Sequence, residues 1–179
     1  MNKSRHNTGT LALTVLALIG ATLFLASCTP RHDWREIHSE RPPYSVLLPA
    51  KPNSQTRDIK LGDIKLAMTM TAAEVDHATY AVGCAELADP AAAKTAMLLM
   101  KTALVGHLNG KLRKEEVIDN AAESRIDVEA IGTPQGEPRI VVARFIAHQK
   151  YAYQIVLTGP EKKVTRDQID TFMTSFKVK

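Results

Sequence analysis

The sequence is poor in aromatic residues and in the short motifs that identify common enzymes. Only 5% of its residues are aromatic and tryptophan occurs once, which argues against a platform for stacking sugar rings. No G-x-S-x-G, H-E-x-x-H, P-loop or C-x-x-C motif is present, so the usual signatures of hydrolases, zinc peptidases, nucleotide-binding proteins and thiol oxidoreductases are missing. The 23 basic and 19 acidic residues are interspersed, which argues against a nucleic-acid partner.

The residues that could still serve catalysis do not form a supported site. Asp76 and His77 resemble half of a catalytic pair, but no nucleophile motif accompanies them. Glu115 and Glu116 are adjacent in an expected strand, so their side chains point to opposite faces. A catalytic site needs groups that support one another. We therefore predict that the protein is not an enzyme and has no cofactor.

The N-terminal segment has the layout of a secretory signal peptide. Residues 1–9 contain Lys3 and Arg5 but no acid, and residues 10–27 are uncharged. The run ends in Leu25-Ala26-Ser27-Cys28, which matches the lipobox of bacterial lipoproteins. This resemblance implies that diacylglycerol is attached to Cys28 through a thioether and that residues 1–27 are removed. Thr29, rather than Asp, follows the cysteine, which by the sorting rule of enteric-type bacteria implies the periplasmic side of the outer membrane.

An uncleaved membrane helix is the competing interpretation of the same segment. Residues 10–27 form an 18-residue uncharged run, at the short limit of a membrane span. Several polar or small residues dilute this run, and no basic cluster beyond Arg31 follows it. Both observations favour the lipoprotein, anchored to a membrane of the cell envelope through its lipid.

Lipidation of Cys28 would leave Cys84 as a lone cysteine, so no internal disulfide is expected. Cys84 lies in an apolar, strand-like stretch without a basic neighbour, and we predict that it is a buried small hydrophobic residue.

Residues 28–43 are polar and contain three prolines, which predicts a tether with little local structure before a single domain at 44–179. Trp34 lies six residues beyond the proposed anchor and could rest among lipid headgroups, but packing against the domain is favoured. His32, Asp33 and His38 match no ligand spacing, so no metal site is predicted.

Periodicity predicts an antiparallel sheet with two helices. Strands are expected at residues 44–49, 56–61, 64–71, 78–86, 112–118, 124–131, 140–148 and 151–158. Asp89 and Pro90 begin the first helix and Asn109-Gly110 ends it, with glycine in the left-handed conformation. Thr165 and Gln168 form a capping box for the last helix, whose Ile169, Phe172, Met173 and Phe176 share one face. Tight turns between consecutive strands indicate the α+β class.

Three segments resemble PsbP-like bacterial proteins. They are Tyr44–Pro52 (YSVLLPAKP), Tyr153–Gly159 (YQIVLTG) and Phe172–Phe176 (FMTSF). The resemblance implies an α-β-α sandwich around an antiparallel sheet, and it implies a scaffold, assembly factor or accessory subunit rather than an enzyme. It supplies no catalytic residue.

Two functions are consistent with these observations. The first is a non-catalytic envelope lipoprotein that binds a protein partner or serves as an accessory subunit. The alternative is a carrier of a lipid or another apolar small ligand, which would need a cavity lined by Met68, Met70, Met97 and Met100. An exposed apolar patch would favour the first function.

Overall fold

The computed structural model of the chain describes residues 32–120, 123–133 and 136–179. The expected signal peptide and Cys28 lie outside the described residues. His32–Lys179 forms one compact unit.

In the described part of the chain, the central sheet has seven strands in the order β3-β4-β5-β9-β8-β7-β6, and every neighbouring pair is antiparallel. The strands are β3 (Asn53–Leu61), β4 (Ile64–Val75), β5 (Ala78–Glu86), β6 (Gly110–Asp119), β7 (Ser124–Gly132), β8 (Arg139–His148) and β9 (Tyr151–Pro160). Gly62 has φ +60°, as the first central residue of a type II′ turn requires between β3 and β4. The predicted antiparallel α+β architecture is confirmed.

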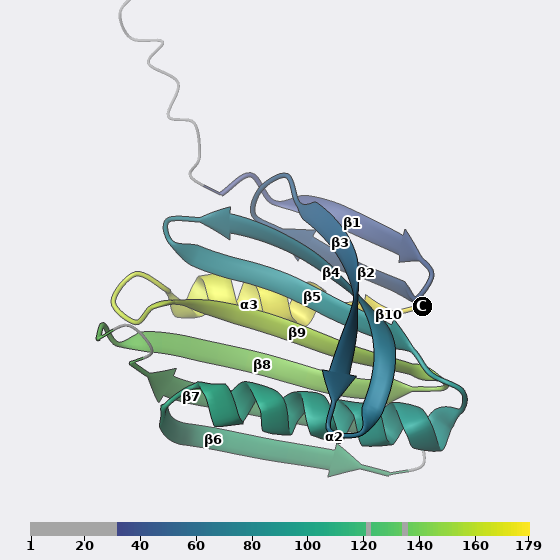
Figure 1. Cartoon of the computed structure of the whole chain (residues 1–179). Helices are drawn as coiled ribbons and strands as arrows, with labels where there is room; N and C mark the ends of the chain where they lie inside the picture. Colours follow the sequence, from purple (N-terminus) through teal and green to yellow (C-terminus); the bar gives the residue numbers. More distant parts are fainter. Residues whose placement is uncertain (1–31, 121–122, 134–135) are drawn as a thin grey trace, which may run out of the picture. The chain divides into compact units, whose positions relative to one another are not determined.

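Helices cover both faces of this sheet. Helix α2 (Pro90–His107) lies on one face, and helix α3 (Arg166–Ser175) lies on the other (Figure 1). A three-stranded sheet, formed by β1 (Arg35–Glu40), β2 (Pro43–Leu48) and β10 (Lys177–Val178), packs beside α3. Strand β9 is therefore buried on both faces: Tyr153 and Ile155 belong to the core under α3, and Ala152 and Val156 to the core under α2.

The helix N-termini form as their sequences predict. The Asp89 side chain accepts a hydrogen bond from the Ala92 amide at 2.8 Å, and Pro90 opens α2. At α3, the Thr165 hydroxyl accepts from the Gln168 amide, and the Gln168 side chain accepts from the Thr165 amide. The capping box is thus complete.

The end of α2 differs from the prediction. Asn109, with φ +44°, takes the left-handed conformation that was assigned to Gly110, and Gly110 begins β6 instead. Asparagine tolerates this conformation because its short polar side chain can form local hydrogen bonds. Glycine at 110 meets a different need, since a Cβ there would lie 2.0 Å from the carbonyl oxygen of Ile131.

The prediction of a tether with little local structure at residues 28–43 is wrong from residue 35 onward. Arg35–Glu40 forms β1, which pairs antiparallel with β2 along its whole length. Apart from Ile37, the side chains of β1 are polar or charged, so they carry no alternating apolar pattern. The strand is held by backbone pairing at the edge of the small sheet, which sequence periodicity does not report.

Candidate functional surface

Cys84 lies inside the core, as predicted. It is 2% exposed in β5, and its thiol donates to the Thr69 carbonyl oxygen at 3.6 Å. Burial raises the pKa of the Cys84 thiol to about 11. Because the thiolate is the reactive form, the side chain behaves as a small hydrophobic residue.

His32, Asp33 and His38 do not converge on one point. His32 stacks on Trp34 with ring centroids 5.8 Å apart, while Asp33 forms an ion pair with Arg35. His38 accepts a hydrogen bond from the Lys179 ammonium at 2.9 Å. Among the described residues, no group of three or more His, Cys, Asp or Glu side chains could hold a metal ion.

Trp34 packs on the domain, which was the favoured of its two expected positions. Its ring meets the ring of Tyr80 edge-on at 5.8 Å, and it contacts the core under α3. Burial raises the pKa of Tyr80 to about 12. The Tyr80 hydroxyl lies 3.5 Å from His32 Nε2, and Gln168 Nε2 lies 3.2 Å from the same nitrogen. The start of the described chain is therefore fixed to the domain.

Asp76 and His77 form a turn. They have φ values of +52° and +65° and make up the two-residue turn between β4 and β5. The His77 carbonyl oxygen accepts a hydrogen bond from Arg139 Nη2 at 3.1 Å. The structure thus gives both residues a structural role in this turn.

The four methionines proposed to line a ligand cavity pack together in the core under α2. Met97 and Met100 are 2% and 1% exposed, and Met68 is also buried. Met70 packs at the margin of the same cluster. A Cβ at Gly83 would lie 2.4 Å from Met68 Cε and 2.6 Å from Met70 Sδ. Met68 and Met70 thus occupy the space above the glycine, and they also line a depression of about 250 Å³ together with Gln55, Arg57 and Ile59.

A groove runs between α3 and the neighbouring strands on the same face of the sheet. We call it the α3 groove; its volume is about 200 Å³. It is lined by Lys114, Asp127, Val128, Glu129, Val142, Ala143, Arg144, Ile169, Asp170 and Met173. Apolar side chains and charges of both signs thus meet in one open depression.

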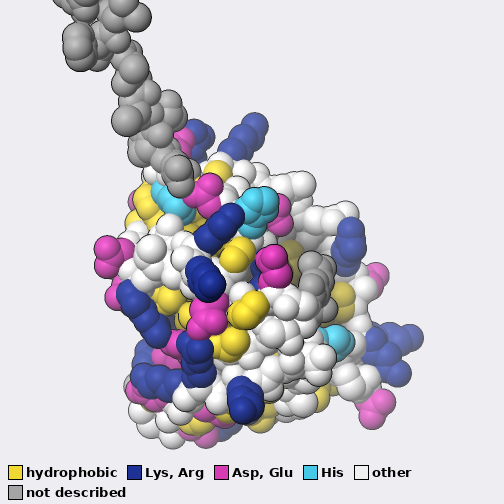
Figure 2. Space-filling model, turned by 90° about the vertical axis from the view of Figure 1, so that its left-hand side faces the viewer, with side chains coloured by type: hydrophobic (Ala, Val, Ile, Leu, Met, Phe, Trp, Pro, Cys, Tyr) yellow, Lys and Arg dark blue, Asp and Glu magenta, His cyan; other side chains and the backbone are white. Residues whose placement is uncertain are grey.

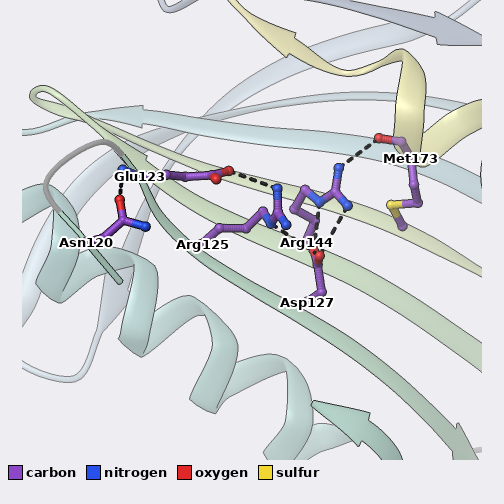
Figure 3. Close-up of polar contacts among 6 residues, drawn as sticks. All are labelled: Asn120, Glu123, Arg125, Asp127, Arg144 and Met173. Carbon is purple, nitrogen blue, oxygen red and sulfur yellow. Dashed lines mark hydrogen bonds and ion pairs between the residues drawn. The ribbon is translucent and has the colours of Figure 1, made fainter. Parts of the chain in front are cut away.

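A chain of paired charges (Figure 3) extends from Arg144 and Asp127, which line the α3 groove, to residues beyond it. Arg144 on β8 contacts both carboxylate oxygens of Asp127, at 2.6 and 3.1 Å, and donates from Nη1 to the Met173 carbonyl oxygen at 3.1 Å. On the other side, Arg125 lies 3.3 Å from Asp127 and donates to Glu123 at 2.9 Å. We call these four charged residues the charge ladder. Met173 is in the last turn of α3, where carbonyl groups lack helical partners and a cation is favourable.

Further polar contacts lie at the α3 groove and at the far end of the charge ladder. At one end, Arg166 of α3 binds Glu129 of β7 with two hydrogen bonds of 2.7 and 2.8 Å. The hydrogen-bonded Arg166 guanidinium lowers the pKa of the Glu129 carboxyl below its ordinary value. At the other end, the Glu123 amide donates to the Asn120 side chain at 3.0 Å. Hydrogen bonds and ion pairs therefore hold these charges in position.

Only an indirect signal for the α3 groove is present in the sequence. In β7, Ile126, Val128 and Ala130 are buried under α2. The alternate residues of the strand include Arg125 and Asp127, which point to the opposite face. This alternation predicts that one face of the strand is exposed to solvent. It does not predict that α3 comes to lie beside that face, because the contact joins segments far apart in the chain.

The outer surface has mixed charge. Figure 2 shows one side of the domain, on which lysine and arginine side chains alternate with acidic ones and apolar groups appear in small areas between them. Among the described residues, no helix is both long enough and apolar enough to cross a membrane.

Comparisons with known proteins show the fold. No family model and no curated protein sequence matches the chain. The solution structure of cyanobacterial PsbP (CyanoP) from Synechocystis sp. PCC 6803 is similar at a TM-score of 0.54 and 16% identity, covering 87% of this chain and 99% of that one. A protein of unknown function from Pseudomonas aeruginosa is similar at a TM-score of 0.37 and 10% identity, covering 72% and 84%. The domain therefore has a PsbP-like fold, as three short segments of the sequence indicated.

Proposed function

We propose that the protein is a lipid-anchored, non-catalytic accessory protein of the cell envelope that binds a protein partner through the α3 groove. The lipobox at Leu25–Cys28 supports the anchor. The PsbP-like fold supports an accessory role, because the resemblance stated above implies scaffolds and accessory subunits rather than enzymes.

The observation that carries the binding proposal is the ordered pair Arg144–Asp127 of the charge ladder, which lines the α3 groove. Arg144 and Asp127 are 22% and 26% exposed, so a partner can reach them, yet their positions are fixed by several hydrogen bonds each. Binding to groups that are already ordered loses less conformational entropy than binding to mobile side chains. The partly buried Val142 supplies most of the apolar contact, and Ile169 and Met173, which are 5% and 6% exposed, add a small area. The groove therefore fits a protein segment that carries charges of both signs around an apolar side chain.

The carrier of an apolar ligand has weaker support. Of the four methionines, only Met68 and Met70 line a depression, of about 250 Å³, whereas Met97 and Met100 are packed in the core under α2, so a ligand that contacted all four would have to enter that core. A ligand at that place would have to displace core side chains, which costs several kcal/mol in a well-packed interior, on the order of the 2–5 kcal/mol lost when a core residue is removed.

Site-specific photo-crosslinking in membranes of the native host tests this function. A photoreactive residue replaces Asp170, which lines the groove, or Leu98, which is 45% exposed on α2 at the opposite face of the sheet. We expect a defined protein adduct from position 170 and not from position 98. The Cys28→Ala chain should lose both the membrane fractionation and the adduct. Identical adducts from both positions, or none from position 170 in the anchored chain, would contradict the proposal.

A further inference from the structure

We infer that the end of the domain that carries His32, the β4–β5 turn and the turn before α3 faces the lipid headgroups, so that the bilayer surface is a second partner of this domain. This inference rests on the proposed lipid at Cys28. It adds an orientation, which the presence of an anchor alone does not define.

The short chain between the lipid and the domain restricts which end of the domain can approach the membrane. Three residues, 29–31, lie between Cys28 and His32, so four Cα–Cα steps join the two. Even fully extended, they span at most about 14 Å. The headgroup layer itself takes up roughly 5–7 Å of that distance, from the difference between total and hydrocarbon thickness. A domain of this size has a radius of gyration of about 15 Å and is roughly 38 Å across. The end opposite His32 therefore cannot reach the membrane to which Cys28 is attached.

This short connection cannot lengthen without breaking contacts between residues 32–34 and the domain. His32 lies between Gln168 and Tyr80, at 3.2 and 3.5 Å from their polar atoms, and stacks on Trp34. The next amide, of Asp33, donates to the Pro49 carbonyl oxygen at 2.9 Å. Release of the segment would expose an aromatic cluster that also reaches Phe172 in the core. The tethered part of the chain thus ends at His32.

The elements around His32 carry basic side chains that anionic lipid headgroups attract. The β4–β5 turn and the turn that precedes α3 lie at the same end of the sheet, on the left in Figure 1. The latter turn carries the exposed Lys162 and Lys163, for which no ion pair exists within the described residues. Arg139 reaches the same end through its bond to the His77 carbonyl oxygen. The acidic residues of this end include Asp76, Asp33, which forms an ion pair with Arg35, and Glu161, which forms an ion pair with Arg113, so Lys162 and Lys163 are left available to lipid phosphates. Flexible lysines near an anionic lipid surface are attracted to it.

Tryptophan fluorescence measures this orientation directly, because Trp34 is the only tryptophan of the chain. The lipidated protein is purified from membranes and reconstituted into vesicles of phosphatidylethanolamine and phosphatidylglycerol that contain a headgroup-labelled dansyl lipid as energy acceptor. A matched probe combines Trp34→Phe with Val117→Trp, at a 58% exposed position of β6 away from the His32 contacts. Circular dichroism checks that both proteins are folded.

We expect Trp34 to lose most of its emission by transfer to the headgroup acceptor and the probe at position 117 to keep most of its own. Equal transfer from both positions, or stronger transfer from position 117, would overturn the orientation. Flotation of the vesicles and the mass of the N-terminal peptide separate this outcome from a failure of the proposed function. If the protein floats and Cys28 carries lipid, energy transfer from position 117 that equals or exceeds transfer from Trp34 refutes the orientation alone. If Cys28 carries no lipid, both proposals fail.

Discussion

Replacement of Arg144 by methionine tests whether the charge ladder fixes α3 to the sheet. The substitution keeps the length of the side chain and removes two hydrogen bonds to Asp127 and one to the Met173 carbonyl oxygen. Hydrogen bonds to charged groups contribute about 1.5–3 kcal/mol each when buried. Because Arg144 and Asp127 are 22% and 26% exposed, solvent screens part of this, and Arg125 still contacts the carboxylate. We expect the free energy of unfolding to fall by about 2–3 kcal/mol in total.

The Arg144→Lys variant is the matched control. Lysine keeps the charge but cannot bind both carboxylate oxygens and the carbonyl of α3 at once, so it should lose about half as much stability. For a domain of this size, a loss of about 2–3 kcal/mol lowers the melting temperature by roughly 5–10 °C. Urea unfolding followed by Trp34 fluorescence should show a lower midpoint with an unchanged slope. A change within about 0.5 kcal/mol for Arg144→Met, typical of ordinary surface positions, would refute the reasoning.

Three further predictions concern other parts of the domain. Gly110→Ala should destabilise it by about 2 kcal/mol or more in thermal unfolding, since the new Cβ would lie 2.0 Å from a backbone oxygen, whereas Gly106→Ala, with nothing within 4 Å, should stabilise α2 by up to about 1 kcal/mol. Cys84, with its thiol pKa at about 11, should react with a thiol reagent at pH 8 only after unfolding; rapid labelling of the native protein would contradict its burial. Arg166→Gln should destabilise the domain at neutral pH, because the pKa of the Glu129 carboxyl is lowered in the fold. Stability that comes from a lowered carboxyl pKa is lost as the pH falls through that pKa, so the variant and the native chain should become equally stable at low pH. A difference in thermal stability between them that persists at low pH would count against this ion pair.

Local chemistry made much of the fold predictable. Thr165 and Gln168 are three residues apart with the side chains of a capping box, and both of their hydrogen bonds form. Strand β5 was predicted at 78–86 and lies at Ala78–Glu86. In these cases, the residues that define the element in the sequence also make the contacts that stabilise it, so the sequence pattern is sufficient to predict the element.

The features that could not be predicted depend on distant segments. β1 has almost no apolar side chains of its own and is a strand because β2 offers it a backbone edge. Gly110 was assigned to a helix end, but its required smallness comes from the carbonyl of Ile131, on another strand. The α3 groove arises only when Met173 approaches Arg144 from the far end of the chain. No spacing rule within one segment contains this information.

The central claim, that a lipid at Cys28 anchors this domain, is tested most directly by the mass of the N-terminal peptide of the protein extracted from native membranes. The account predicts a mature chain that begins at Cys28 and carries diacylglycerol on the cysteine sulfur, and a Cys28→Ala chain that lacks both the cleavage and the lipid. A membrane-bound chain that retains residues 1–27, or a mature chain with an unmodified Cys28, would contradict it.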